Sequence, residues 1–423
     1  MANVLNSKTE ESPDPESTAS EQTPEAPLLS EPRDGIPPVV ADDEELARVA
    51  AKFAAGSGPV AVDAERASGY RYGQRAYLVQ LRRAGAGTAL IDPVACPDLS
   101  VLRDAVGDAE MVLHAAHQDL PCLTEVHLRP RRLFDTELAG RLLGYQRVGL
   151  GAMVERVLGV RLAKEHAAVD WSIRPLPEDW LRYAALDVEV LIELRDALEA
   201  ELAETGKLEW ARQEFAAVLA APPKEPRPDP WRRTSGIHRV RSQRGLGVVR
   251  ELWLERDRIA RERDLSPGRV LQDSAIVEAA LAMPRTPQEL TAIKTFTVRL
   301  ARRYVPVWLK AINRVRDMKP AELPQPSPPG YGPPPTNRWA DRDPAAARRL
   351  EAARSVVAEI AERVGMPTEN LLQPDAVRRL AWSPPSQVSV DSVAEHLRTH
   401  QARDWQIELT AAALAEALRA ADR

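Results

Sequence analysis

The sequence predicts a layered α/β domain followed by two all-helical blocks. Between residues 41 and 222, short apolar runs of strand length alternate with amphipathic helical patterns, which is typical of a sheet covered by helices. From residue 239 onward only helical periodicity remains. The Pro-rich stretch at 221–231 separates the α/β part from the helical part, and a second one at 320–335 divides the helical part in two.

These boundaries give five regions. We expect residues 1–40 to form a disordered acidic tail, because so polar and Pro-rich a segment buries too little apolar surface to offset its chain entropy. The other four are an α/β domain at 41–222, a helical domain at 223–319, a linker at 320–336 and a second helical domain at 337–423.

The elements of the α/β domain can be assigned in order. The stretch DDEELARVAAKFAA predicts a helix opened by acidic residues in its first turn. Three apolar strands follow, GPVAVDAE, RAYLVQLRRAG and GTALIDPV. The stretch DLSVLRDAVGDA predicts a second helix, and EMVLHAA predicts a buried strand. Helices dominate from TELAGRLLG onward, and the apolar spacing of WLRYAALDVEVLIEL at 180–194 predicts one continuous helix.

The two helical blocks resemble each other. Each opens with a long charged helix, continues through a short loop (RDLSPGRVLQD or VGMPTENLLQP), and then has a shorter helix. This shared order suggests two diverged copies of one module.

Charge is distributed unevenly along the chain. The net charge is −5, but residues 224–319 contain 22 Lys and Arg against 11 Asp and Glu. Such a basic block indicates an anionic partner, or else a solvated helical surface. The only two cysteines, Cys96 and Cys122, form no CxxC pair, which fits a reducing cytoplasm and excludes a thiolate zinc site. We find no signal peptide and no membrane-spanning run, so we expect a cytoplasmic protein without a membrane partner.

Asp63 and Glu65 lie two residues apart in an otherwise apolar strand. Side chains at i and i+2 emerge on the same face, where two carboxylates repel each other and are costly to desolvate. A hard divalent cation, Mg²⁺ or Mn²⁺, would relieve that repulsion. The alternative is an exposed strand end.

Three further residues extend this acidic set. Asp119 follows the strand EMVLHAA at the expected start of a helix, where a plain N-cap is the alternative role. Tyr183 and Asp187 lie four residues apart and so share one helix face. A buried hydrogen-bonded pair is the alternative there.

Taken in order, these residues resemble the three motifs of the DEDD superfamily of 3′→5′ exonucleases, in its Tyr-bearing subtype. Asp63 and Glu65 match the first motif, Asp119 the second, and Tyr183 with Asp187 the third. The flanking stretches FDTELAGRLLG, LVQL and DWSIRPLPEDWLRYAALDV are similar to those of the ribonuclease D family, and the resemblance covers residues 58–215. The first helical block resembles the HRDC module; the second does so less clearly.

The resemblance implies a ribonuclease-H-like (DnaQ-like) fold and two-metal hydrolysis. Asp63 is then expected to bridge two Mg²⁺ or Mn²⁺ ions, with Glu65 and Asp187 on the first ion and Asp119 on the second. Tyr183 is expected to orient or deprotonate the attacking water. The implied activity is that of a monomeric exoribonuclease that trims stable RNA such as tRNA precursors and releases nucleoside 5′-monophosphates.

Contacts to the RNA are expected from basic and polar side chains around the site and in the first helical block. Arg66 departs from the family, which often has an apolar or aromatic residue there, and could approach a phosphate. We expect nucleic-acid contacts from Arg66, His114, Arg239, Arg241 and Arg244.

Three other functions remain open at this stage. A DNA exonuclease would use the same acidic residues. A non-catalytic nucleic-acid-binding scaffold, or an adaptor that binds proteins through its helical modules, would leave the full set of carboxylates unexplained.

Overall fold

The structure is a computed structural model, and it describes residues 26–163, 168–223, 225, 227–296, 298–326 and 332–423. The outer part of the expected tail (1–25) and the middle of the expected linker (327–331) lie outside these residues. In the described part of the chain, no helix is both long enough and apolar enough to cross a membrane.

A six-stranded mixed sheet forms the centre of the α/β domain, in the order β2-β5-β4-β3-β6-β7. The strand β3 pairs antiparallel with β4 on one side and parallel with β6 on the other. This places β3, which carries Asp63 and Glu65, in the interior of the sheet. The strands are β2 (Val39–Val40), β3 (Ser57–Arg66), β4 (Ala76–Ala84), β5 (Gly87–Ile91), β6 (Glu110–Leu113) and β7 (Arg132–Asp135).

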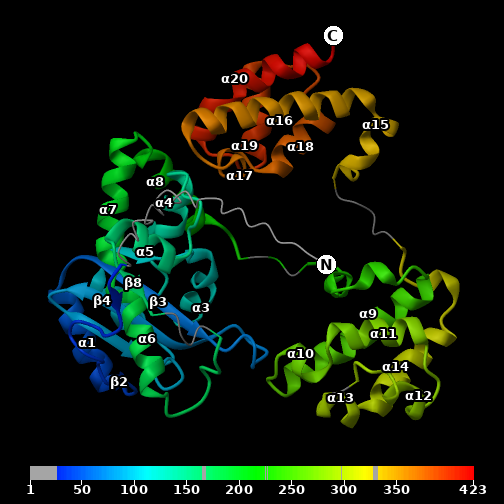
Figure 1. Cartoon of the computed structure of the whole chain (residues 1–423), viewed down its shortest axis with the longest axis horizontal. Helices are drawn as coiled ribbons and strands as arrows, with labels where there is room; N and C mark the ends of the chain where they lie inside the picture. The colour runs from blue at the N-terminus through cyan, green and yellow to red at the C-terminus, as the bar shows by residue number, and fades with distance from the viewer. Residues whose placement is uncertain (1–25, 164–167, 224, 226, 297, 327–331) are drawn as a thin grey trace, which may run out of the picture.

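Helices cover both faces of the sheet. The helix α6 (Glu178–Glu189) lies across β3, β4 and β5, as Figure 1 shows. Its Ala184 and Ala185 share a buried cluster with Leu78 of β4 and Leu90 of β5. The other helices of this domain are α1 (Asp43–Ala55), α2 (Ser100–Val106), α3 (Leu120–Glu125), α4 (Thr136–Leu142), α5 (Leu150–Leu158), α7 (Leu191–Glu204) and α8 (Leu208–Ala220). The mixed α/β fold expected from the sequence is therefore confirmed.

The expected disorder of residues 1–40 is wrong for residues 26–40. Leu28 and Leu29 form β1 (Leu28–Leu29), which pairs in parallel with β8 (Arg161–Leu162). Charged side chains also find partners: Glu31 lies 2.9 Å from Arg182, and Asp34 lies 2.9 Å from Arg82. Two of the acidic side chains that predicted disorder therefore form ion pairs with basic residues of the folded domain.

The helix expected over 180–194 is divided in two. The helix α6 ends at Glu189, and α7 begins at Leu191 after Val190, whose φ is −100° and ψ is −8°. The two helices have different neighbours: α7 packs on β6, α4 and α5, whereas α6 packs on β4 and β5, and both contact β3. Tyr183 and Asp187 both remain on α6.

The two helical blocks have the same order of elements. The first has α9 (Gln243–Glu262), the short α10 (Pro267–Val270) and α11 (Asp273–Ala282), and the second has α16 (Pro344–Val364), the short α17 (Thr368–Leu371) and α18 (Pro374–Trp382). This recurrence supports the expectation of a duplicated module. The remaining helices are α12 (Pro287–Thr291), α13 (Arg299–Arg303), α14 (Val305–Asp317), α15 (Trp339–Arg342), α19 (Val390–Thr399) and α20 (Asp404–Ala421).

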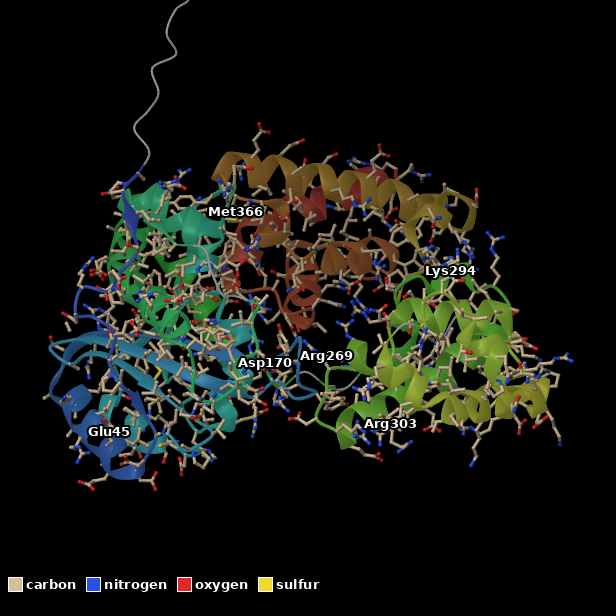
Figure 2. The ribbon with its side chains drawn as sticks, turned by 60° about the horizontal axis from the view of Figure 1, so that its bottom comes forward. Glu45, Asp170, Arg269, Lys294, Arg303 and Met366 are labelled. Carbon is tan, nitrogen blue, oxygen red and sulfur yellow. The ribbon has the colours of Figure 1, made fainter. Side chains whose placement is uncertain are left out.

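The second block shares a continuous apolar core with the α/β domain. Trp405 of α20 stacks on Trp210 of α8 with 5.0 Å between ring centroids, and its indole N–H donates to Glu214 over 3.1 Å. The ammonium of the buried Lys207 donates to the carbonyl of Gly365 over 3.2 Å. Met366, labelled in Figure 2, belongs to the same shared core.

The first block has a core of its own, against which Tyr72 of the α/β domain packs, and it makes polar contacts with the same domain. They are made by the β3–β4 loop (residues 67–75), which directly follows the strand of Asp63 and Glu65. The Arg269 guanidinium, labelled in Figure 2, donates to the carbonyl of Gly69 over 2.9 Å. The Tyr72 hydroxyl donates to Asp257 over 2.9 Å. The first block is therefore hydrogen-bonded to the loop that extends from the acidic strand.

Gly144→Ala should loosen the second helical block. Gly144 has a φ of +79°, and a Cβ at this position would collide with the carbonyl oxygen of Gly365. Gly159 is a matched control, because its φ is +69° but no atom lies within 4 Å of its Cβ position. Both Ala variants pay about 1–2 kcal/mol for the left-handed backbone. We expect a larger loss of unfolding free energy in urea for Gly144→Ala, and equal losses would contradict the close contact.

Candidate active site

One pocket of about 740 Å³ collects the acidic residues that the sequence singled out. The carboxylates come from β3, from the start of α3 and from α6, so segments more than 120 residues apart in the chain meet there. The polar residues that line the pocket are Asp63, Glu65, Arg66, His114, Gln118, Asp119, Tyr183 and Asp187.

The register of the sheet explains how β3 presents its two carboxylates. Asp63 pairs with Gln80 and Glu65 pairs with Leu78 across the antiparallel ladder. Directly opposed residues point to the same face of a sheet, and Leu78 packs against α6. Asp63 and Glu65 therefore face α6.

The helix α6 contributes the other half of the cluster. One ligand oxygen from each of Asp63, Glu65 and Asp187 can be chosen so that all three lie within 4.8 Å of one another. The Tyr183 hydroxyl hydrogen-bonds to Asp187, one turn further along the same face. The phenol and the carboxylate therefore face the same part of the pocket.

Asp119 occupies the N-cap position of α3 but does not cap it, because its side chain makes no hydrogen bond to the first turn. The side chain that does cap a helix nearby is that of Asp135, at the start of α4. That carboxylate accepts from the backbone of Glu137 and Leu138, and also from Ala115 and Ala116 beside the pocket. Asp119 lies in the pocket with 6% of its surface exposed.

Arg66 is the nearest cation to this cluster. Its guanidinium lies 3.3 Å from the carboxylate of Asp119. A metal ion on Asp119 therefore has to share this carboxylate with Arg66 or displace it.

Burial dominates the electrostatics of the pocket. Desolvation raises the pKa of Asp63, Glu65 and Asp187, and for Glu65 the charges of Asp63 and Asp187 raise it further. Desolvation and the charge of Asp63 raise the pKa of Asp119 to about 8. Carboxylates held this close are ionised together only beside a compensating cation. These oxygen donors fit Mg²⁺ or Mn²⁺, which prefer them.

The two histidines of the segment HAAH separate. His114 lines the pocket, donates to or accepts from Thr136 over 2.9 Å, and has its pKa lowered to about 4 by burial, so it is neutral at pH 7. His117 lies on a neighbouring hollow beside Asp135. Of the two, only His114 is placed to meet a ligand in the acidic pocket.

The three arginines expected to contact nucleic acid from the first helical block are not brought to this pocket. Arg239 pairs with Glu278 over 2.8 Å, and Arg241 is exposed. Arg244 donates to the carbonyls of Val315 and Arg316 at the end of α14. Their contact with nucleic acid stays a prediction, and Arg244 in addition has a structural role.

Sequence reasoning missed the apolar wall of the pocket and one polar residue near it. The wall comes from Leu150 and Gly151 of α5 and from Leu162 of β8, none of which carries a chemical signal. Gln80, opposite Asp63, is fully buried, and its amide has no hydrogen-bond partner among the described residues. Its place beside Asp63 could have been read from strand register alone.

Three parts of the chain match known families. Residues 38–203 match the family described as 3′–5′ exonuclease, residues 245–312 match the HRDC domain, and residues 332–418 match the family described as 3′ to 5′ exonuclease C-terminal domain. The HRDC-like character of the second helical block stays a prediction, since its match carries a different description.

Curated relatives carry the name ribonuclease D. The one from Nitrobacter hamburgensis is 33% identical over 220 residues, which cover 48% of this chain and 57% of that protein. The one from Sphingobium indicum is 33% identical over 268 residues, which cover 61% of this chain and 68% of that protein. The matched stretch thus spans less than two thirds of the first relative and just over two thirds of the second.

Solved structures agree with these matches. A protein from Bifidobacterium adolescentis is 38% identical, with a TM-score of 0.84 over 93% of this chain and 100% of that one. Escherichia coli RNase D, described as an exoribonuclease involved in structured RNA processing, is 26% identical. Its TM-score is 0.66 over 90% of this chain and 98% of that one.

Without divalent cations, the stability of the protein should fall as pH rises. A carboxyl whose pKa is raised by folding stabilises the fold below its unfolded pKa, and that contribution is lost as pH rises through the folded value, about 8 for Asp119. In EDTA, Asp119→Asn should therefore melt at a higher temperature than the parent protein, by a margin that grows from pH 5 to pH 8. Adding Mn²⁺ at pH 8 should reverse that order. A constant difference across this pH range would show that Asp119 is already ionised.

Proposed function

The chain belongs to the ribonuclease D family of 3′→5′ exoribonucleases, and we propose that its acidic pocket carries out the hydrolysis. The supporting observation is the convergence of four carboxylates and a phenol on one pocket from three separate elements. We further propose that the protein acts as a cytoplasmic monomer on 3′ ends of structured RNA, such as tRNA precursors.

In this proposal Asp63, Glu65, Asp119 and Asp187 hold two Mg²⁺ or Mn²⁺ ions. When bound, such a pair activates a water and stabilises the negative charge on the leaving oxygen. The water oxygen forms a bond to the terminal phosphorus, and the bond from phosphorus to the 3′ oxygen breaks. The 3′ oxygen takes up a proton, which leaves a shortened RNA and a nucleoside 5′-monophosphate.

Tyr183 orients the attacking water. Without metal ions, burial and the charges of Asp187 and Glu65 raise the pKa of the phenol well above its usual value, so the hydroxyl is protonated at neutral pH when the ions enter. A protonated phenol held by Asp187 has lone pairs with which it accepts a hydrogen bond from the water. This favours the role of orienting the water over that of deprotonating it, the two roles implied by the resemblance.

In this proposal Arg66 and His114 contact the RNA. Both line the pocket; Arg66 carries a charge that a phosphate can share with Asp119, and neutral His114 offers a ring nitrogen to a ribose or base. Phosphate contacts in the first helical block would act on the body of the RNA, away from the pocket.

Asp63→Asn and Asp187→Asn should each abolish metal-dependent hydrolysis, because each removes a charge that the cations need. The assay measures release of nucleotides from a 3′-labelled, 3′-extended tRNA in Mg²⁺ or Mn²⁺, and in EDTA. Asp108→Asn is the control, since Asp108 is highly exposed and lies outside the pocket. Hydrolysis at the parent rate by either pocket variant, or in EDTA, would exclude the proposed site.

Tyr183→Phe should lower kcat about 100-fold while metal binding persists. Tyr145→Phe is the matched control, because it removes a hydroxyl that donates to Glu201, away from the pocket. Turnover and Mn²⁺ uptake by calorimetry are measured for both. An unchanged kcat for Tyr183→Phe would remove the phenol from the reaction.

RNA should be hydrolysed faster than DNA of matched sequence and length. The assay compares single strands with identical 3′ ends under the same metal concentration. Equal or faster hydrolysis of DNA would favour the alternative of a DNA exonuclease, and no metal-dependent turnover on either strand would favour the non-catalytic scaffold.

A further inference from the structure

A second hollow, of about 500 Å³, adjoins the acidic pocket. The two share Gly151, Leu162 and Ala163 in their linings, so they lie side by side. We call the second hollow the side groove and define it by Leu28, Arg147, Gly151, Glu155 and Arg161. A strand whose end lies in the acidic pocket can therefore leave along the side groove.

The N-terminal segment builds one wall of the side groove. The backbone of Arg161 donates to the carbonyl of Pro27 over 2.9 Å, and its guanidinium donates to the carbonyl of Ala26 over 3.0 Å. This pairing holds Leu28 at the groove with 56% of its surface exposed. An apolar side chain kept in solvent by strand pairing offers a contact surface for a base or a ribose.

The charge changes sign between the two hollows. Among the described residues, the acidic pocket has four carboxylates and one arginine, whereas the side groove has Arg147 and Arg161 against Glu155. Arg147 is exposed and has no hydrogen-bond or ion-pair partner among the residues that the structure describes. An unpaired cation next to an exposed apolar side chain suits an RNA strand. The cation can bind a phosphate, which carries one negative charge per nucleotide, and the apolar side chain can contact a base or ribose.

The helix α5 adds to this positive potential. Its N-terminal residues Leu150 and Gly151 lie at the junction of the two hollows, and its N-cap Gly149 has no side chain that could satisfy the first N–H groups. The positive end of the helix dipole therefore points at the junction, where it favours an anion.

We propose that the side groove binds the RNA nucleotides upstream of the two that flank the scissile phosphate. Arg147 contacts a phosphate there, and Leu28 packs against a base or ribose. This inference deepens the proposed exoribonuclease function and rests on it. It assigns a substrate-binding role to Arg147 and to Leu28 of the N-terminal segment, both of which lie outside the three acidic motifs.

Binding measurements test the groove without hydrolysis. The full-length protein is titrated with a 5′-fluorescent hexanucleotide RNA in EDTA, at several salt concentrations. Arg147→Gln should weaken binding about fivefold and make the slope of log K against log salt shallower by about 0.7, the value for one lost phosphate contact on a single strand. Arg48→Gln is the control, since Arg48 is exposed on α1 and pairs only with Glu44. Equal slopes for both variants would overturn the phosphate contact.

Kinetics with substrates of different length provide a second test. A dinucleotide reaches only the acidic pocket, so Arg147→Gln and Leu28→Ser should leave its kcat/KM unchanged. For a hexanucleotide both variants should raise KM about fivefold with kcat preserved. An equal loss of kcat/KM for both lengths would show that these residues act through the stability of the fold, and it would overturn the proposed role of the groove. If the parent protein hydrolyses neither substrate in Mg²⁺, the proposed exoribonuclease function is wrong, and the role of the groove, which rests on it, is wrong as well. Failure of the groove alone would leave hydrolysis by the parent protein intact.

Discussion

The repulsion among buried carboxylates is the constraint on which this structure depends. Folding brings Asp63, Glu65 and Asp187 within 4.8 Å at their oxygens, and desolvation raises the pKa of each. A fold tolerates such a cluster when it holds cations or protons there. The rest of the α/β domain fixes the geometry: β3 lies inside the sheet, and α6 is packed across it through two alanines. Small side chains let the helix approach closely enough for its carboxylate to join the strand.

The acidic residues were predictable because their signals are local. A separation of two in a strand and of four in a helix each place side chains on one face, whatever the rest of the chain does. Asp119 was ambiguous, since an N-cap and a pocket residue have the same sequence context. The structure resolves it, because the Asp119 side chain makes no capping hydrogen bond to α3 and lines the pocket. The strand β1 and the pocket wall were not predictable. Two-residue strands gain their stability from distant partners, and apolar wall residues resemble any core residue.

The two helical blocks attach to the nuclease domain in different ways. The second shares its core and is fixed by Trp405 and Lys207. The first has a separate core and is attached to the β3–β4 loop through hydrogen bonds and through the packing of Tyr72. Such a junction buries less apolar surface than a shared core. We therefore expect the first block to separate from the α/β domain at a lower free energy than the second.

The ordered N-terminal segment has a consequence for variation among related proteins. Its backbone pairing with β8 requires little of its side chains, so their identity can change while the strand stays in place. Leu28 is one such position, with its side chain directed to solvent. Replacing it with an aromatic, a polar or a charged residue would leave the carboxylates and the fold intact. Exchange of these few residues would therefore change the RNA that the side groove accepts, without altering the reaction itself.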